Sequence, residues 1–349
     1  MELKKFVIIL IFFLIPLATG CNRDYVTEIE DEILKGKEEE IVEEEKPKEK
    51  VGIPSPISGL HASEEKVNRR PIVIMFDNHP EARWQAGLSQ AEIVYEFMVE
   101  APYTRYMGVY LINEPESIGP IRSSRPYFIT TLLEYDPIYV RVGGSPAAKK
   151  DIINFKIADI DGLSCPNRVL WRNTKVHKKA PHNTYTTMSI LRKYQEEIGC
   201  KELGNYKEFD FHKVDTDLEG FEASKILINY YKNNITLYTY NPDEKMYYRQ
   251  KDGQLHIDEL DNSPIKAKNI VIQEAKTKII DKEGRLSIDL VGEGKGKYIT
   301  NGKGIDIKWS KKSRDNKTCY YDKMGKRIRF NPGITWIQVV NIEPDINIE

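Results

Sequence analysis

The sequence predicts an α/β (or α+β) N-terminal domain followed by a mostly β C-terminal domain, and three observations lead to this fold class. The continuous apolar run at 72–76 suits a strand buried on both faces of a sheet. Up to about residue 200, segments with helical spacing alternate with such runs. After about residue 205, short β-branched and aromatic runs are separated by hairpin-turn signals such as Lys251-Asp252-Gly253.

In the N-terminal part, we expect strands at 72–76, 106–112 and 138–142. The capping-box sequence Ser89-Gln90-Ala91-Glu92 predicts a short helix that Pro102 stops, although residues 93–95 also suit a strand. Proline at a first turn or glycine after a last turn marks further helices, at 126–134, 147–153 and 187–198.

The C-terminal part is expected to form a meander or a small barrel. Its predicted strands lie at 225–231, 236–240, 247–249, 269–272, 276–280, 327–330 and 333–339. Together with the N-terminal features below, this divides the chain into a signal peptide (1–20), a disordered tether (21–52), an N-terminal domain (53–205) and a C-terminal domain (206–345).

The first twenty residues have the layout of a signal peptide. Lys4 and Lys5 precede an apolar stretch at 6–17, and the small-residue run 18–20 leads directly to Cys21. A cysteine at this point resembles a bacterial lipobox, in which Cys21 becomes the lipidated first residue of the mature protein. The alternatives are a plain secretory signal and an N-terminal membrane anchor, but the apolar run is shorter than the ~20 residues of a membrane span.

A lipidated Cys21 predicts a protein held at the cell membrane, on its extracytoplasmic face, by palmitate or a similar chain. Residues 22–50 hold 12 acidic and 6 basic side chains and almost no aromatic ones, which is typical of a disordered, self-repelling spacer. Outside the membrane we expect no nucleic-acid partner.

Three further cysteines follow, Cys165, Cys200 and Cys319, with no C-x-x-C spacing. This pattern predicts no zinc site and no redox motif, and we expect neither a metal nor a cofactor. Two outcomes are possible: one disulfide, with Cys165 and Cys200 as the nearer pair, or three free thiols.

Several short motifs lie along the chain and together form a recognisable pattern. They are Asp77-Asn78, Gln85-Ala86-Gly87-Leu88-Ser89, Val99-Glu100, Thr104-Arg105, Ile118-Gly119-Pro120-Ile121-Arg122-Ser123-Ser124-Arg125, Gly143-Gly144-Ser145, Pro181-His182-Asn183, Trp309-Ser310-Lys311 and Pro332-Gly333-Ile334-Thr335-Trp336-Ile337. Over about residues 54–341, this pattern resembles the YerB-like lipoproteins of Gram-positive bacteria. The resemblance implies two domains and a place in the cell envelope, and it implies no activity, because the family is a domain of unknown function.

Two of these motifs have features of an anion-binding site. Arg122 and Arg125 lie three residues apart at a helix start, where guanidinium groups and free amides suit a carboxylate or a phosphate. The alternative is internal pairing with Glu96, Glu100 or Asp136. Gly143-Gly144-Ser145 forms a second such turn, whose alternative is a tight turn with a serine cap. The ligand-binding candidates are Arg105, Arg122, Ser123, Arg125, Gly143, Gly144, Ser145, Arg172 and Asn183.

Asp77, Glu100 and His182 are the candidates for catalysis. His182 suits a general base with Asp77 or Glu100 as its orienting partner, and Asp77-Asn78-His79 directly follows the first strand. A structural histidine is the alternative, and no nucleophile-elbow motif is present in the sequence.

These features favour a tethered binding protein for an anionic envelope ligand over an enzyme. The alternatives are a cell-envelope hydrolase that uses His182 with Asp77, Glu96 or Glu100, and a scaffold for another membrane protein, whose identity the sequence does not indicate.

We expect the substitution Cys21→Ala to abolish lipidation, because the thiol that accepts the lipid is lost. Metabolic labelling with a palmitate analogue should mark the wild-type protein and leave the variant unmarked. Labelling that survives the substitution would contradict the assignment of Cys21.

Overall fold

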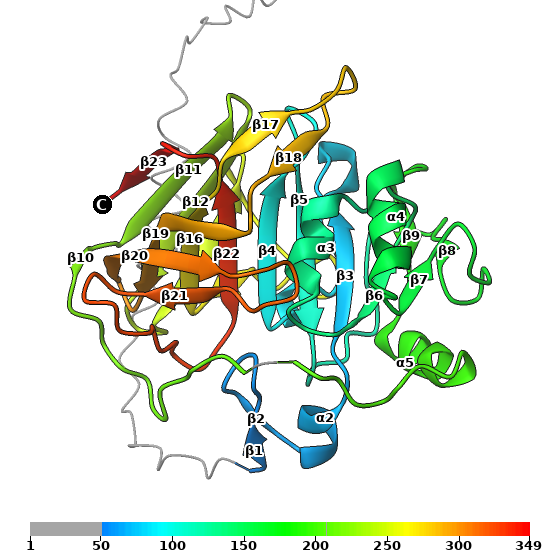
Figure 1. Ribbon diagram of the computed structural model, residues 1–349, viewed down its shortest axis with the longest axis horizontal. Helices are drawn as coiled ribbons and strands as arrows, with labels where there is room; N and C mark the ends of the chain where they lie inside the picture. Colours follow the sequence, from blue (N-terminus) through cyan, green and yellow to red (C-terminus); the bar gives the residue numbers. More distant parts are fainter. Residues whose placement is uncertain (1–50, 207) are drawn as a thin grey trace, which may run out of the picture. The chain divides into compact units, whose positions relative to one another are not determined.

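A computed structural model describes residues 51–206 and 208–349 (Figure 1). The predicted signal peptide, Cys21 and nearly all of the predicted tether lie outside the described residues. Within the part of the chain that the structure describes, every helix is too short or too polar to cross a membrane.

The main feature is a sheet of eleven strands to which both halves of the sequence contribute. From one edge to the other it runs β10 (Phe221–Glu222), β20 (Lys303–Lys311), β19 (Gly292–Thr300), β16 (Asn269–Glu274), β22 (Thr335–Val340), β4 (Ile93–Met98), β5 (Thr104–Tyr110), β3 (Ile72–Asp77), β6 (Ile138–Arg141) and β7 (Asp159–Asp161), with β21 (Cys319–Tyr321) beside β20.

Strand β22 joins the two halves, because it pairs in parallel with β16 on one side and with β4 on the other. Ile337 lies opposite Val271 in β16 and opposite Tyr95 in β4. All six residues of β22 are buried, as expected for a strand covered on both faces.

This pairing bears on the two predicted domains, because both contribute strands to the same sheet. Residues Lys50–Glu349 form one compact unit, in which the predicted segments 53–205 and 206–345 share a sheet. The change of sequence texture near residue 205 is real, but it marks where helices cease rather than where the hydrophobic core ends.

Among the described residues the helices all lie in the N-terminal half. They are α2 (Glu64–Asn68), α3 (Pro126–Leu132), α4 (Pro146–Asn154) and α5 (Met188–Glu197), with short 3-10 turns η1 (Pro80–Ala82) and η2 (Leu88–Gln90). Helices α3, α4 and α5 begin within one residue of the predicted starts, whereas α2 was not predicted. Proline occupies the first turn of α3 and of α4. In Figure 1, α3 and α4 lie side by side over the β5–β3–β6 part of the sheet.

The prediction of a helix after the Ser89–Glu92 capping box is wrong. The alternative that we gave, a strand, forms there as β4. Glu92 is fully buried and does not cap a helix. Its carboxylate accepts hydrogen bonds from the amides of Leu111 (2.5 Å) and Ile112 (3.0 Å). The cap-like spacing therefore reflects a buried tertiary contact.

The C-terminal half adds a second, six-stranded sheet. It comprises β14 (Gln254–Leu255), β13 (Met246–Lys251), β12 (Asn234–Asn241), β11 (Lys225–Tyr231) and β23 (Asp345–Ile348), with β15 (Lys266–Ala267) beside β13. Burial alternates along β11 and β12, so one face of this sheet packs inward. Smaller ladders pair β1 (Ile53–Pro54) with β2 (His61–Ala62), β8 (Trp171–Arg172) with β9 (Thr184–Tyr185), and β17 (Thr277–Ile279) with β18 (Leu286–Ile288).

The predicted fold class is confirmed: a helix-bearing N-terminal half precedes a C-terminal half built of strands, and β11, β12 and β13 form the expected meander. The prediction of a strand at 327–330 is wrong, because these residues form isolated β-bridges, at Arg327 and Phe330, rather than a continuous ladder. Cys165, Cys200 and Cys319 are free thiols, which was one of the two open outcomes.

A buried ion cluster ties the two sheets together. Glu96 of β4 contacts Arg249 (2.5 Å) and Lys251 (3.2 Å) of β13, and all three side chains are fully buried. Burial raises the pKa of Glu96, but Lys251 and Arg249 outweigh this effect and hold its pKa below the ordinary value. Glu96 is therefore a structural carboxylate, and the catalytic role that we considered for it is not supported.

We expect Glu96→Ala to lower the free energy of unfolding by about 3–5 kcal/mol, because it leaves two buried cations without a partner. Urea unfolding followed by tryptophan fluorescence and by circular dichroism should show one shifted transition in both signals. Because the folded-state pKa of Glu96 is lowered, the difference between variant and wild type should shrink as pH falls below the ordinary carboxyl range. A change below about 1 kcal/mol at pH 7 would contradict this account.

Candidate functional site

The predicted site residues gather where the first sheet opens. Strands β3 and β6 run in parallel as far as Ile74 and Val140 and then separate. The chain around Arg122 enters this opening: the Arg122 amide donates to the Met75 carbonyl (2.8 Å), and the Arg122 carbonyl accepts from the Val142 amide (3.1 Å). Carboxyl ends of parallel strands are the usual place for ligand sites in such sheets.

Asp77, the last residue of β3, is the buried centre of one group of contacts. Its Oδ2 atom lies 2.8 Å from Nδ1 of His182 and 3.0 Å from Nε of Arg122. Its Oδ1 atom accepts a hydrogen bond from the His79 amide at 3.0 Å. One carboxylate therefore contacts the neighbouring His79 amide and two side chains, His182 and Arg122, from distant parts of the sequence.

Glu100 is the centre of a second group. It binds Arg125 through two hydrogen bonds, from Nε to Oε1 (2.7 Å) and from Nη2 to Oε2 (2.8 Å). Nη2 of Arg105 lies 3.9 Å from Glu100, and Nη1 of Arg105 donates to the Ser123 carbonyl (2.9 Å). The Ser123 hydroxyl accepts a long bond from Arg125 (3.4 Å).

The two groups adjoin each other, because Asp77 and Arg105 are directly opposed on β3 and β5. Burial, together with the neighbouring Arg125 and Arg122, lowers the pKa of Arg105 to about 10. Three guanidinium groups thus face Asp77 and Glu100 at this position, and two of the three are nearly buried.

Solvent reaches these cations unequally. The side chain of Arg122 is 28% exposed, whereas those of Arg105 and Arg125 are 9% and 11% exposed. Arg122 is therefore the guanidinium group of the cluster that an external anion meets first.

The Gly143-Gly144-Ser145 turn is close to this opening, but its amides donate within the chain. The Gly143 amide donates to Asp161 (2.7 Å), and the Ser145 amide donates to the Ser124 carbonyl (3.2 Å). The Ser145 hydroxyl accepts from the Ala148 amide (3.3 Å) at the start of α4. This geometry is that of the tight turn with a serine cap, the alternative given above.

Arg172 lies in β8, Asn183 directly precedes β9, and the two side chains contact each other. Arg172 donates to the Asn183 side chain (3.3 Å) and to the Pro181 carbonyl (3.0 Å). These bonds hold the residues on either side of His182, so Arg172 and Asn183 support the position of the histidine.

Sequence reasoning missed Glu81, which lies beside the histidines. Oε2 of Glu81 is 3.5 Å from Nε2 of His182. The rings of His79 and His182 stack with centroids 4.5 Å apart, and burial together with His182 lowers the pKa of His79. In the described part of the chain, these three side chains form one group that could hold a metal ion, with candidate ligand atoms within 4.8 Å of one another. The H-x-E spacing directly after a strand end was the available signal.

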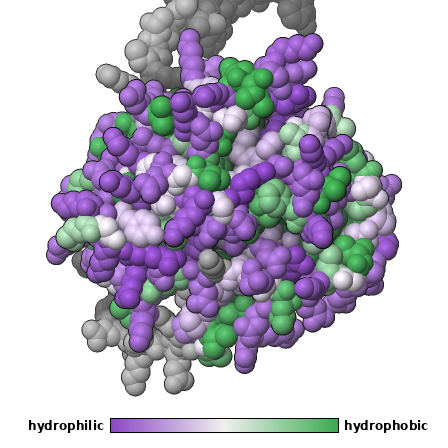
Figure 2. Space-filling model, viewed as in Figure 1, coloured by the Kyte–Doolittle hydropathy of each residue, from purple (hydrophilic) through white to green (hydrophobic). Residues whose placement is uncertain are grey.

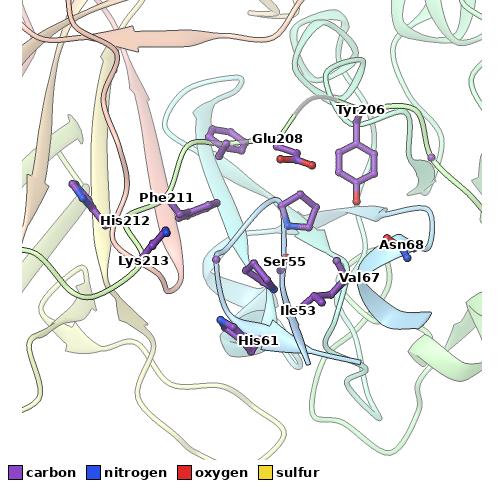
Figure 3. Close-up of a pocket in the computed structure, with 15 residues that line it drawn as sticks. Ile53, Ser55, His61, Val67, Asn68, Tyr206, Glu208, Phe211, His212 and Lys213 are labelled. Carbon is purple, nitrogen blue, oxygen red and sulfur yellow. The ribbon is translucent and has the colours of Figure 1, made fainter. Parts of the chain in front are cut away.

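A separate cavity of about 860 Å³ lies between the β1–β2 ladder and the chain around Phe211 (Figure 3). Figure 3 shows His61, Val67 and Tyr206 around it. None of the predicted site residues lines this cavity.

Comparison with known proteins now places the chain in a family. The family model described as "Protein of unknown function (DUF3048) N-terminal domain" matches residues 57–201, and the corresponding C-terminal domain matches residues 226–337. The chain belongs to the DUF3048 family. The predicted resemblance to YerB-like lipoproteins is thereby confirmed, because a YerB protein is a close relative.

This DUF3048 protein is 36% identical over 296 residues to "Putative lipoprotein YerB" of Bacillus subtilis (strain 168), a match that covers 84% of this chain and 87% of the relative. It also resembles the crystal structure of the YerB protein from Bacillus subtilis, with a TM-score of 0.78 and 33% identity over 85% of this chain and 99% of that chain. The name of this relative describes a lipoprotein and states no activity.

We expect Arg125 and Arg122 to differ in their effect on stability. Arg125→Ala should lower the free energy of unfolding by about 1.5–3 kcal/mol, because it removes two charge-assisted bonds to Glu100. Arg122→Ala should cost less than about 1 kcal/mol, since Asp77 keeps its contacts with His182 and His79. Urea unfolding of both variants tests this difference, and equal losses would show that Arg122 is a structural residue.

Proposed function

We propose that this DUF3048 protein is a lipoprotein, anchored to the cell membrane through Cys21, that binds an anionic ligand of the cell envelope at the guanidinium cluster of Arg105, Arg122 and Arg125. The observation that carries the proposal is the gathering of three guanidinium groups where the sheet opens, one of which, Arg122, is 28% exposed. The anchoring is supported by the lipobox-like sequence and by the name of the Bacillus subtilis relative.

The arrangement of the cluster favours an anion over a neutral ligand. Two of the guanidinium groups are nearly buried, and the lowered pKa of Arg105 reports their mutual repulsion as well as burial. A phosphate or carboxylate beside Arg122 would reduce this repulsion. Its oxygens would accept paired hydrogen bonds from the exposed guanidinium group.

A hydrolase is the second candidate, and the Asp77–His182 bond of 2.8 Å supports it. Both ring nitrogens of His182 face carboxylates, Asp77 on one side and Glu81 on the other. A reaction at this histidine would therefore use water as the nucleophile rather than a hydroxyl or thiol that His182 activates.

The scaffold alternative would be favoured by a broad apolar surface. On the face shown in Figure 2, hydrophobic residues form small separate groups among hydrophilic ones. Scattered groups of this kind are ordinary on soluble surfaces. This face therefore favours the binding proposal.

We expect Arg122→Ala to weaken anion binding by about 10–100-fold, the equivalent of one charge-assisted interaction of about 1.5–3 kcal/mol. The probe is a fluorescent teichoic-acid fragment with glycerol phosphate repeats, and its affinity is read by fluorescence anisotropy. Inorganic phosphate and acetate as competitors separate phosphate recognition from carboxylate recognition.

The matched control is Arg168→Ala, because Arg168 is 61% exposed and pairs with Glu197 away from the strand ends. Both variants lose one positive charge, so a purely non-specific attraction would weaken equally in both. Equal weakening, or wild-type affinity in Arg122→Ala, would contradict the proposed site.

A further inference from the structure

We propose that His79, Glu81 and His182 form a binding site for a divalent transition metal of the zinc type. Two imidazoles and one carboxylate are a ligand set that zinc uses in proteins, with three protein ligands and a fourth position left for water or another ligand. This inference goes beyond the proposed function, because the guanidinium cluster needs no metal to attract an anion.

The three side chains are close enough for one ion. Their candidate ligand atoms lie within 4.8 Å of one another, and zinc–ligand bonds are about 2.0–2.2 Å long. Glu81 is 73% exposed, so its carboxylate can rotate toward the histidines without disturbing the core. Coordination requires the three ligand atoms to move closer together, and the exposed Glu81 side chain has room to make part of this movement.

His182 is already oriented as a metal ligand. Its Nδ1 atom lies 2.8 Å from Oδ2 of Asp77, and its Nε2 atom lies 3.5 Å from Oε2 of Glu81. Metal-bound histidines commonly bond a carboxylate through the second ring nitrogen, which fixes the tautomer and leaves the first nitrogen with a lone pair. Asp77, buried and in contact with the His79 amide as well, is the positioning residue of the site.

The Nδ1 atom of His79 accepts a hydrogen bond from the Glu81 amide at 3.2 Å, so this nitrogen carries no proton. Coordination of a metal ion by the same lone pair would replace that hydrogen bond. The His79 ring stacks on His182 (4.5 Å between ring centroids) and contacts Tyr103 (4.6 Å). Because the lone pair of an imidazole nitrogen lies in the plane of its ring, the His79 ring must turn out of this stack for both histidines to bind one ion.

The charges of the surrounding groups suit a divalent cation. Glu81 and Asp77 supply two carboxylates within contact of the histidines, and the Arg122 guanidinium, 3.0 Å from Asp77, is the cation paired with that carboxylate. An ion at this place would lie beside the most exposed guanidinium group of the cluster.

The test is a titration of the full-length protein, purified in detergent and stripped with a chelator, with Co²⁺. We expect one equivalent of Co²⁺ to bind with the intense visible absorption of tetrahedral coordination, and Zn²⁺ to displace it. Glu81→Gln and His79→Asn should each weaken Co²⁺ binding by about tenfold or more. Asparagine at position 79 keeps the hydrogen-bond acceptor that caps the η1 turn.

The control variant is His61→Asn, which changes an exposed histidine that contacts the Gly52 carbonyl in another part of the structure. It should bind Co²⁺ as the wild type does. Absence of stoichiometric binding would overturn the proposal, and so would wild-type affinity in Glu81→Gln. Because Glu81 is exposed, its substitution leaves folding intact and gives a decisive reading even if His79→Asn does not fold.

Discussion

The structure depends on the parallel pairing of β22 with β4. Residues 335–340 fill the gap between β4 and β16, so strands from both halves of the sequence form one sheet. The buried contacts of Glu96 with Arg249 and Lys251 then fix the second sheet against the first. The site at the end of β3 is two strands away from β4 and therefore rests on a core that the C-terminal half completes.

Within that frame, two carboxylates organise the site. Asp77 and Glu100 hold His182 and the arginines in fixed positions, so the geometry exists before any ligand arrives. Such fixed positions reduce the entropy lost on binding. They also keep the cations close together in a poorly solvated place, where an added negative charge has a larger effect than at an open surface.

Sequence reasoning placed Asp77, Arg122 and His182 together because each follows a strand or precedes a regular element, and position along a strand is a local property. It gave the pairing of Arg125 with Glu100 only as an alternative, because partners that meet in space carry no local signal. Glu96 and Arg249 lie 153 residues apart, and neither sequence neighbourhood indicates the other. Strand β19 was missed since its glycines resemble a loop, whereas Gly294 in fact makes room for the indole of Trp309.

The position of β22 near the end of the chain has a consequence for biogenesis. A polypeptide that is synthesised from its N-terminus presents β4 long before its partner β22 exists. Until residues 335–340 arrive, the neighbouring edges of β4 and β16 have unpaired backbone groups, which are prone to pair with other chains. Synthesis must therefore be nearly finished before folding can be, and a chain truncated ahead of Thr335 would leave an open slot in the middle of its sheet rather than a shortened end.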